Sequence, residues 1–197
     1  MLAQARAAIV STLFFTLLLG VGYPLLVTGI GQLAFPAQAG GSLIRDRSGQ
    51  VIGSALIAQK FERPEYLHPR PSAAGTDGYD ASGSSGSNLG PLNPDLAKRM
   101  AKDAASLRGE AGGAVIPADA VTTSGSGLDP HISPANALMQ AARIAAARGA
   151  PDAQVRKIIQ AHIVPPVLGV FGQPTVNALE TNLALDTALP RSKPPAR

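Results

Sequence analysis

The chain has 197 residues, no cysteine, a formal net charge of +4 and a pI of about 9.8. Residues 42–189 contain 13 Lys/Arg and 13 Asp/Glu, so the positive excess comes from Arg6 and from Arg191, Lys193 and Arg197 in the tail. A nucleic-acid-binding face needs clustered basic residues, usually with aromatic side chains for stacking. The balanced charge and the few scattered aromatic residues therefore exclude nucleic acid as a partner. Without cysteines, the redox compartment cannot be inferred.

A long uncharged segment near the N-terminus predicts a helix that spans the lipid bilayer. No charged residue lies between Arg6 and Arg45, and a run of about 20 apolar residues is enough to cross the hydrocarbon core. A cleaved signal peptide is the alternative, because Ala37-Gln38-Ala39 resembles a cleavage site, but its apolar region spans only about 7–15 residues. The predicted parts are a flank at residues 1–6, a single transmembrane helix at 7–33 and a linker at 34–41.

One face of the predicted membrane helix carries Thr12, Thr16 and Gly20, spaced four residues apart. Small residues at this spacing let a second helix approach closely in lipid, so this face is a candidate contact with a partner helix. The alternative is that Gly and Thr are simply frequent in membrane helices. The flanking charges do not distinguish the two orientations, and long domains are translocated largely regardless of charge.

Residues 42–189 are expected to form one soluble domain of mixed helices and strands, of the α/β or α+β class, followed by a basic disordered tail at 190–197. Residues 42–57 read as two short strands around a turn at Arg47-Ser48-Gly49. Residues 68–94 form a long Pro/Gly/Ser/Asn loop, which in a compact domain is usually functional or disordered. The expected core residues of the two strands are Val51, Ile52, Leu56 and Ile57.

The rest of the domain alternates between helical and strand patterns. A helix is expected after Asn93-Pro94, a short strand within 115–129, and a helix at 151–163 that buries Val155, Ile158 and Ile159. Residues 172–189 fit a strand or a helix equally well. A further helix begins with Ser133 as N-cap and Pro134, and ends at Gly149. Its expected buried stripe is Ala135, Leu138, Met139, Ala142, Ala145 and Ala146, with Asn136, Gln140 and Arg143 on another face.

The stretch SGSGLDPHISP, residues 124–134, brings Ser126, Asp129 and His131 close together in the sequence. A membrane-anchored serine hydrolase that uses Ser126 and His131 is therefore one hypothesis. However, Gly125-Ser126-Gly127 is not the G-x-S-x-G nucleophile elbow, and catalytic triads are normally assembled from distant segments. The three histidines lack the spacing of a metal site, and no P-loop sequence is present. The residues alone indicate polar loops that suit either a partner surface or solvated connections.

Several motifs in the same order resemble the KdpC family, the C subunit of the Kdp potassium-transporting P-type ATPase, over nearly the whole chain. They are YPLL (23–26), GSLI (41–44), GSALI (53–57), RPSA (70–73), SGSNL (85–89), TSGSGLDPHISP (123–134) and NLALD (182–186). Two departures stand out: Pro69 occupies a position where the family typically has Gly, and VNALETNL (176–183) is less apolar than usual.

The resemblance implies an accessory, non-enzymatic subunit of a potassium importer in the bacterial inner membrane. A channel-like partner subunit would carry potassium, and a P-type partner subunit would hydrolyse ATP. Family members are described both as a catalytic chaperone that raises ATP affinity and as a cap over the ion entrance. A cap requires the domain outside, which we favour, whereas direct ATP contact requires it inside. No cofactor is expected to bind tightly.

Two sets of residues follow from this resemblance. Gln140 and Arg143, expected on an exposed helix face, are the candidates for direct nucleotide contact. The predicted interface with the partner subunits consists of His68, Arg70, Ser72, Asn88, Ser126, Asp129 and His131.

Overall fold

The computed structural model describes residues 2–46 and 48–189, which fall into two compact units, Met1–Ile52 and Gly53–Arg197. The predicted disordered tail at 190–197 lies outside the described residues, as does Arg47 of the predicted turn. The chain combines one apolar N-terminal helix with a mixed domain of helices and short strands, which confirms the expected fold class. The two units are described separately below.

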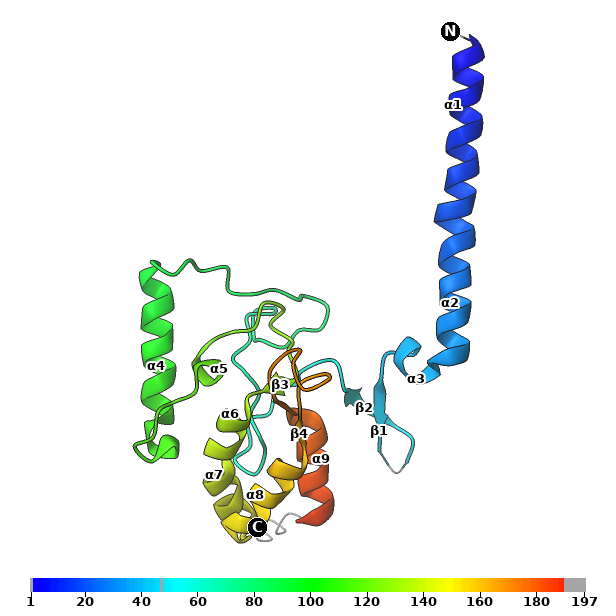
Figure 1. The fold of residues 1–197 in the computed structure, drawn as a ribbon. Helices are drawn as coiled ribbons and strands as arrows, with labels where there is room; N and C mark the ends of the chain where they lie inside the picture. The colour runs from blue at the N-terminus through cyan, green and yellow to red at the C-terminus, as the bar shows by residue number, and fades with distance from the viewer. Residues whose placement is uncertain (1, 47, 190–197) are drawn as a thin grey trace. The chain divides into compact units, whose positions relative to one another are not determined.

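In the first unit, a continuous apolar helix contains α1 (Leu2–Phe15), a π-helical turn η1 (Thr16–Gly22) and α2 (Tyr23–Ala34) (Figure 1). The segment Gln4–Ala34 is the one helix among the described residues that is long and apolar enough to cross a membrane. None of its large apolar side chains is covered by the rest of the chain. The long apolar helix expected from the sequence is therefore present as an unbroken helical segment.

Pro24 explains the π-helical turn in the middle of this helix. A proline inside an α-helix lacks an N–H donor, and its ring collides with the carbonyl group four residues earlier. Here Tyr23, the residue before it, donates its N–H to the carbonyl of Leu18, five residues back. A wider π-turn of this kind is a known way to insert an irregularity into an α-helix. The helix therefore continues through Pro24 instead of ending there.

After the short helix α3 (Pro36–Ala39), the strands β1 (Leu43–Arg45) and β2 (Val51–Ser54) pair as a two-stranded sheet. The turn between them is held by Asp46 Oδ1, which accepts hydrogen bonds from the N–H groups of Ser48 and Gln50 at 2.8 and 2.9 Å. The two predicted strands are confirmed. The predicted core is wrong for Val51 and Leu56, which are 42% and 61% exposed, because residues 42–57 form only a small hairpin and a turn.

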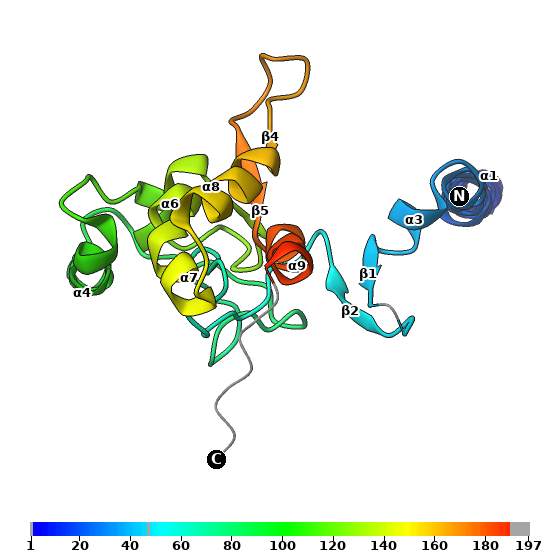
Figure 2. The ribbon, with the colours of Figure 1, turned by 90° about the horizontal axis from the view of Figure 1, so that it is seen from below.

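The second unit packs helices against a small antiparallel sheet of order β3-β5-β4. Its register pairs Val176 of the central strand with Ile132 on one side and with Ile163 on the other. Helix α4 lies at the periphery of the unit in both ribbon views (Figures 1 and 2). The elements are α4 (Pro94–Ala111), α5 (Ala118–Val121), β3 (His131–Ile132), α6 (Pro134–Met139), α7 (Ala141–Arg148), α8 (Asp152–Ala161), β4 (Ile163–Val164), β5 (Thr175–Asn177) and α9 (Ala178–Ala188).

Two segments have a different secondary structure from the one that their patterns suggested. The ambiguous segment 172–189 contains a strand and a helix, because Asn177 ends β5 and its side chain accepts a hydrogen bond from Glu180 N–H as the N-cap of α9. The strand expected within 115–129 is wrong. That segment forms the short helix α5, which follows Pro117 and has Asp119 in its first turn, where an acidic residue is favourable.

The apolar core of the second unit lies among α6, α7, α8, α9 and the sheet. Val155 and Ile159 on α8 are fully buried and Ile158 packs against them, which confirms the expected face. The stripe predicted for residues 134–148 is wrong for Ala135, Ala142 and Ala146, which are exposed, and confirmed for buried Ala145 and for Leu138, which packs against the core. The buried face instead contains Ala137, Ala141 and Ile144, together with two polar residues, Asn136 and Gln140.

Segment 64–68 explains why polar side chains are buried on these helices. Its residue Leu67 is fully buried, donates its N–H to Asn182 Oδ1 at 2.7 Å and accepts a bond from Asn182 Nδ2 at 3.0 Å. His68 makes the same two-point contact with Gln140, at 2.8 Å through its N–H and 3.0 Å through its carbonyl. Buried backbone groups must be paired, and here side-chain amides replace a neighbouring strand.

We expect Asn182→Leu to lower the free energy of unfolding by roughly 2–5 kcal/mol, because the N–H and C=O groups of buried Leu67 would both lose their partner. Thr187→Ala is the matched control on the same helix, where an exposed substitution should cost no more than about 0.5 kcal/mol. Denaturant unfolding of the full chain measures both values. Equal stability of the two variants would contradict this role of Asn182.

Candidate partner interface

Two polar segments far apart in the sequence, residues 70–88 and 122–131, are joined by hydrogen bonds into a single surface, which we call the paired loops. Ser85 N–H donates to the carbonyl of Ser126 at 2.9 Å, and Ser84 Oγ donates to the same carbonyl at 3.1 Å. Ser72 Oγ donates to the carbonyl of Gly127 at 2.6 Å. The long loop that starts at residue 68 is therefore held in a defined conformation through its first half.

Gly127 makes the close approach of the two loops possible. Its φ is +68°, a conformation in which glycine carries little strain. A Cβ atom at this position would lie 2.5 Å from the carbonyl oxygen of Ser85 and 2.7 Å from the backbone nitrogen of Ala74. Neither atom belongs to a side chain that could rotate away. The sequence TSGSGLD therefore requires glycine at 127 for a packing reason.

Arg70 links the two loops through contacts with Thr123 and Asp129, and Asp129 in turn contacts His131. Its guanidinium lies 3.5 Å from Asp129 Oδ2 and donates to the carbonyl of Thr123 at 3.1 Å. Asp129 Oδ1 in turn accepts the N–H of His131 at 3.0 Å and lies 3.4 Å from the Nδ1 of its ring. The side chains of Arg70, Asp129 and His131 are 25%, 33% and 40% exposed, so they are held internally and still reach the surface.

Ser72 and Tyr79 form the second anchor of the surface. Ser72 Oγ accepts hydrogen bonds from the N–H groups of Ala74 and Tyr79, at 3.1 and 2.8 Å. Tyr79 has a φ of +58°, which is uncommon for a bulky residue, and its hydroxyl donates to the carbonyl of Arg70 at 2.7 Å. Burial raises the pKa of Tyr79 to about 12, so the hydroxyl stays a donor at neutral pH. Sequence reasoning missed Tyr79; a lone aromatic in a Gly/Ser loop was its only signal.

Ser126 and His131 are not arranged as a nucleophile and its base. Ser126 Oγ accepts a hydrogen bond from Leu128 N–H at 3.1 Å, which is a local turn contact. His131 is directed to Asp129, and within the described residues its ring makes no hydrogen bond with Ser126. Nucleophilic catalysis needs the two side chains within hydrogen-bond reach. The geometry gives the serine hydrolase hypothesis no support.

His68 and Asn88 lie outside the Arg70–Asp129–His131 group. The His68 ring is 3.1 Å from the carbonyl of Arg63, and burial together with the charge of Arg143 lowers the pKa of His68. Protonation is therefore disfavoured in the folded state, and the neutral ring packs as part of segment 64–68. Asn88 is exposed with a φ of +52°, a conformation that asparagine tolerates better than most residues.

Gln140 and Arg143 do not form an open helix face, and this expectation is wrong. Gln140 is 4% exposed and clamps His68, as described above. Arg143 donates to Glu110, to Gln140 Oε1 and to the backbone carbonyls of segment 64–68. The start of α6 has a partly buried partner of its own. The carboxylate of Asp119 accepts hydrogen bonds from Ser133 and Asn136, a contact that sequence reasoning missed.

The histidines and acidic side chains do not converge on a metal-binding geometry in the part of the chain that the structure describes. No group of three or more His, Asp or Glu residues within 2–46 and 48–189 lies close enough to hold a metal ion. His162, at the C-terminal end of α8, is 2.8 Å from the carbonyl of Ile158 through Nδ1. This contact is local, between the ring and the backbone of the last turn of the same helix.

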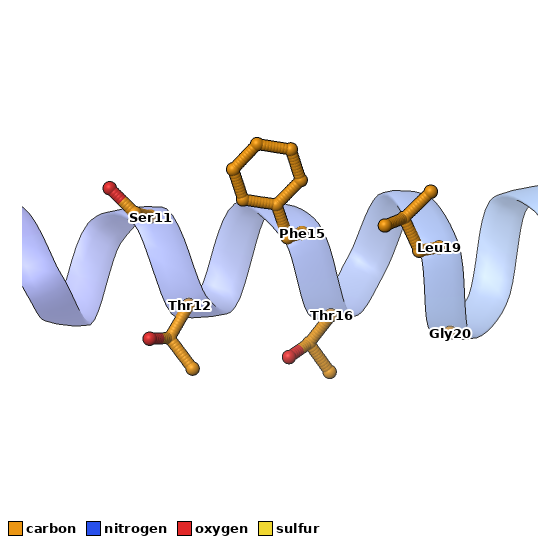
Figure 3. Close-up of a pocket in the computed structure, with 6 residues that line it drawn as sticks. All are labelled: Ser11, Thr12, Phe15, Thr16, Leu19 and Gly20. Carbon is orange, nitrogen blue, oxygen red and sulfur yellow. The ribbon is translucent and has the colours of Figure 1, made fainter.

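In the first unit, Thr12, Thr16 and Gly20 line one side of a shallow groove on the apolar helix (Figure 3). Ser11, Phe15 and Leu19 form its other side, and the absence of a Cβ at Gly20 leaves the helix backbone exposed there. The groove is lined by one helix alone. Its shape allows close approach of a second helix in lipid, as the spacing of the small residues predicts.

Gly127→Ala should destabilise the full chain by roughly 2–4 kcal/mol, because the new methyl group meets the Ser85 and Ala74 backbones at a positive φ. Gly125→Ala is the matched control two residues earlier. A Cβ there meets nothing within 4 Å, so the cost should stay near about 0.5 kcal/mol. Thermal unfolding compares the two variants, and comparable midpoints would show that the loops do not depend on Gly127.

The chain is similar to subunits of potassium-transporting ATPases over nearly its whole length. A family model described as "K+-transporting ATPase, c chain" matches residues 5–187. Potassium-transporting ATPase KdpC subunits are 63% identical in Caulobacter sp. strain K31, covering 96% of both chains, and 59% identical in Beijerinckia indica, covering 99% of both. The subunit from Rhodopseudomonas palustris is 50% identical over 97% of this chain and all of its own length. The chain therefore belongs to the KdpC family, the c chain of the potassium-transporting ATPase.

Proposed function

We propose that this chain is a non-catalytic subunit that stabilises the assembly of a potassium-transporting ATPase. A channel-like partner subunit would carry potassium, since one membrane helix cannot enclose a pore by itself. A P-type partner subunit would bind and hydrolyse ATP, and this chain would need no tightly bound cofactor of its own. The supporting facts are the family membership, the single candidate membrane helix and the absence of a nucleophile–base pair at Ser126.

The observation that carries this proposal is the pre-organised polar surface of the paired loops. Arg70, Asp129 and His131 are positioned by internal hydrogen bonds before any partner arrives, and all three remain partly exposed. A surface that is already ordered loses less conformational entropy on binding. Partly exposed charged groups also favour selection of one correct partner over a wrong one. We assign to this surface the contact with the outer part of a partner subunit.

A second contact would form within the bilayer. The groove beside Thr12, Thr16 and Gly20 would receive a helix of a partner subunit. In lipid the hydrophobic effect does not drive helices together, so their association depends on the close packing that small residues allow. One contact inside the membrane and one outside would act together, since the first raises the effective concentration for the second.

We place the second unit on the outer, periplasmic side of the bacterial inner membrane, where it could also cap the ion entrance. On that side ATP is out of reach, so any increase in the ATP affinity of the pump subunit would be a coupling free energy transmitted through the complex. The internal contacts of Gln140 and Arg143 support this indirect route, because both side chains are already engaged by segment 64–68 and its neighbours.

The location of the second unit can be measured directly, because the chain has no cysteine. A single cysteine introduced as Ala105→Cys, on the exposed surface of α4, should react with a membrane-impermeant maleimide in intact cells. A cysteine introduced into a cytoplasmic loop of the pump subunit is the negative control. Labelling of Ala105→Cys only after lysis would place the unit inside and refute the cap.

We expect Asp129 and His131 of the paired loops to contribute to the binding of partner subunits and not to the stability of the fold. We expect Asp129→Asn combined with His131→Gln to lower the affinity for the partner subunits by about tenfold, because the first substitution removes the carboxylate and the second removes the imidazole ring, while each side chain keeps a similar size. Asp77→Asn, an exposed acidic residue in the same loop, is the control. Co-purification of the complex and potassium uptake are the readouts. Wild-type assembly by the double variant, with normal unfolding, would refute the interface.

A further inference from the structure

The connection between β4 and β5, residues 165–174, forms an apolar hairpin tip that the proposed function does not use. It projects away from the helices of its unit, as the orange segment of Figure 2 shows. Val167, Leu168, Val170 and Phe171 are 69%, 85%, 74% and 66% exposed. No charged residue occurs anywhere in residues 163–179. A contiguous apolar patch of this kind on a protein surface usually marks an interaction site.

Four backbone N–H groups of the hairpin tip, those of Val167, Gly169, Val170 and Phe171, are paired within the turn. Val167 N–H donates to the carbonyl of Phe171 at 2.9 Å, and Phe171 N–H donates back to Val167 at 3.0 Å. Gly169 N–H donates to the carbonyl of Pro166 at 2.9 Å, while Pro165 and Pro166 have no N–H group that needs a partner. The tip is therefore a closed turn whose exposed part consists mainly of apolar side chains.

Leu168 is the most exposed large apolar residue of the hairpin tip and has a φ of +53°. A leucine pays conformational strain in this region, where glycine or asparagine would not. Strain of this kind persists where the surrounding structure enforces it, and it clusters at sites of function. A large apolar side chain that is 85% exposed gains nothing from water, whereas it would gain free energy by moving into an apolar environment.

We propose that the hairpin tip inserts into the lipid interface of the same bilayer that holds the N-terminal helix. The lipid interface accepts an uncharged segment, and the pairing of N–H groups within the turn lowers the cost of moving its backbone out of water. A protein partner that adds a strand at the tip would need the N–H and C=O groups of Val167 and Phe171, which already bond to each other. The membrane helix keeps the second unit near a lipid surface at high effective concentration.

Because the chain contains no tryptophan, a single reporter can test the proposal. Phe171→Trp in the full chain, reconstituted alone into phosphatidylcholine/phosphatidylglycerol vesicles, should emit at shorter wavelength than in water. Its fluorescence should be quenched by brominated phospholipids and protected from iodide. Leu92→Trp is the matched control, since Leu92 is a large apolar residue of the same unit and is 95% exposed. This reporter should stay accessible to iodide and unaffected by the brominated lipid.

Further variants make the outcome unambiguous. Val170→Trp should repeat the lipid quenching, which guards against a local disturbance by one substitution. Adding Leu168→Asp to Phe171→Trp should abolish the quenching, because a charge in the apolar layer is costly. Iodide-accessible emission from both reporters in vesicles would overturn the proposal. So would protection that arises only after the other subunits of the complex are added, since the occupant would then be protein. Both leaflets offer lipid, so the result does not depend on which side the unit occupies.

Discussion

The second unit depends on one arrangement: side-chain amides that pair with the backbone of an otherwise unpartnered segment. Asn182 and Gln140 each donate to and accept from the chain at Leu67 and His68, in the way a neighbouring strand would. The segment can therefore be buried without leaving N–H or C=O groups unpaired, which would cost about 1–3 kcal/mol for each group. Buried Arg148 adds a bond to the carbonyl of Glu65 and an ion pair with Asp186.

This buried segment leads directly into the paired loops. From His68 the chain continues to Arg70 and Ser72, whose side chains contact Thr123 and Gly127 on the other loop. The core and the polar surface are thus parts of one hydrogen-bonded network. Because irregular segments have few repetitive backbone bonds, such side-chain contacts determine their conformation. The serine and glycine residues of the loops are explained by this network without any catalytic role.

The surface of the molecule combines two apolar features with one polar region. The N-terminal helix is uncovered along its length and has the length and composition of a membrane span. The hairpin tip at residues 165–174 exposes apolar side chains in a unit whose core is otherwise well formed. The helix pairs its backbone internally and the hairpin tip pairs four of its N–H groups within the turn, which favours contact with lipid. The polar paired loops present the opposite chemistry and suit a protein surface.

Composition, helix-capping residues and residue spacing were sufficient to predict several helices from the sequence. Charge and length predict the N-terminal helix, Ser133 and Pro134 mark a helix start, and the spacing of Val155, Ile158 and Ile159 predicts the buried face of α8. Long-range pairing decided what these rules could not. Asn136 and Gln140 are buried because Asp119 and His68 lie against them, across many residues of intervening sequence. Ser126 lacks a base because the fold directs His131 to Asp129. The spacing of apolar residues predicts a buried face only where buried residues are apolar. The partner that allows a polar side chain to be buried is supplied only by the tertiary structure.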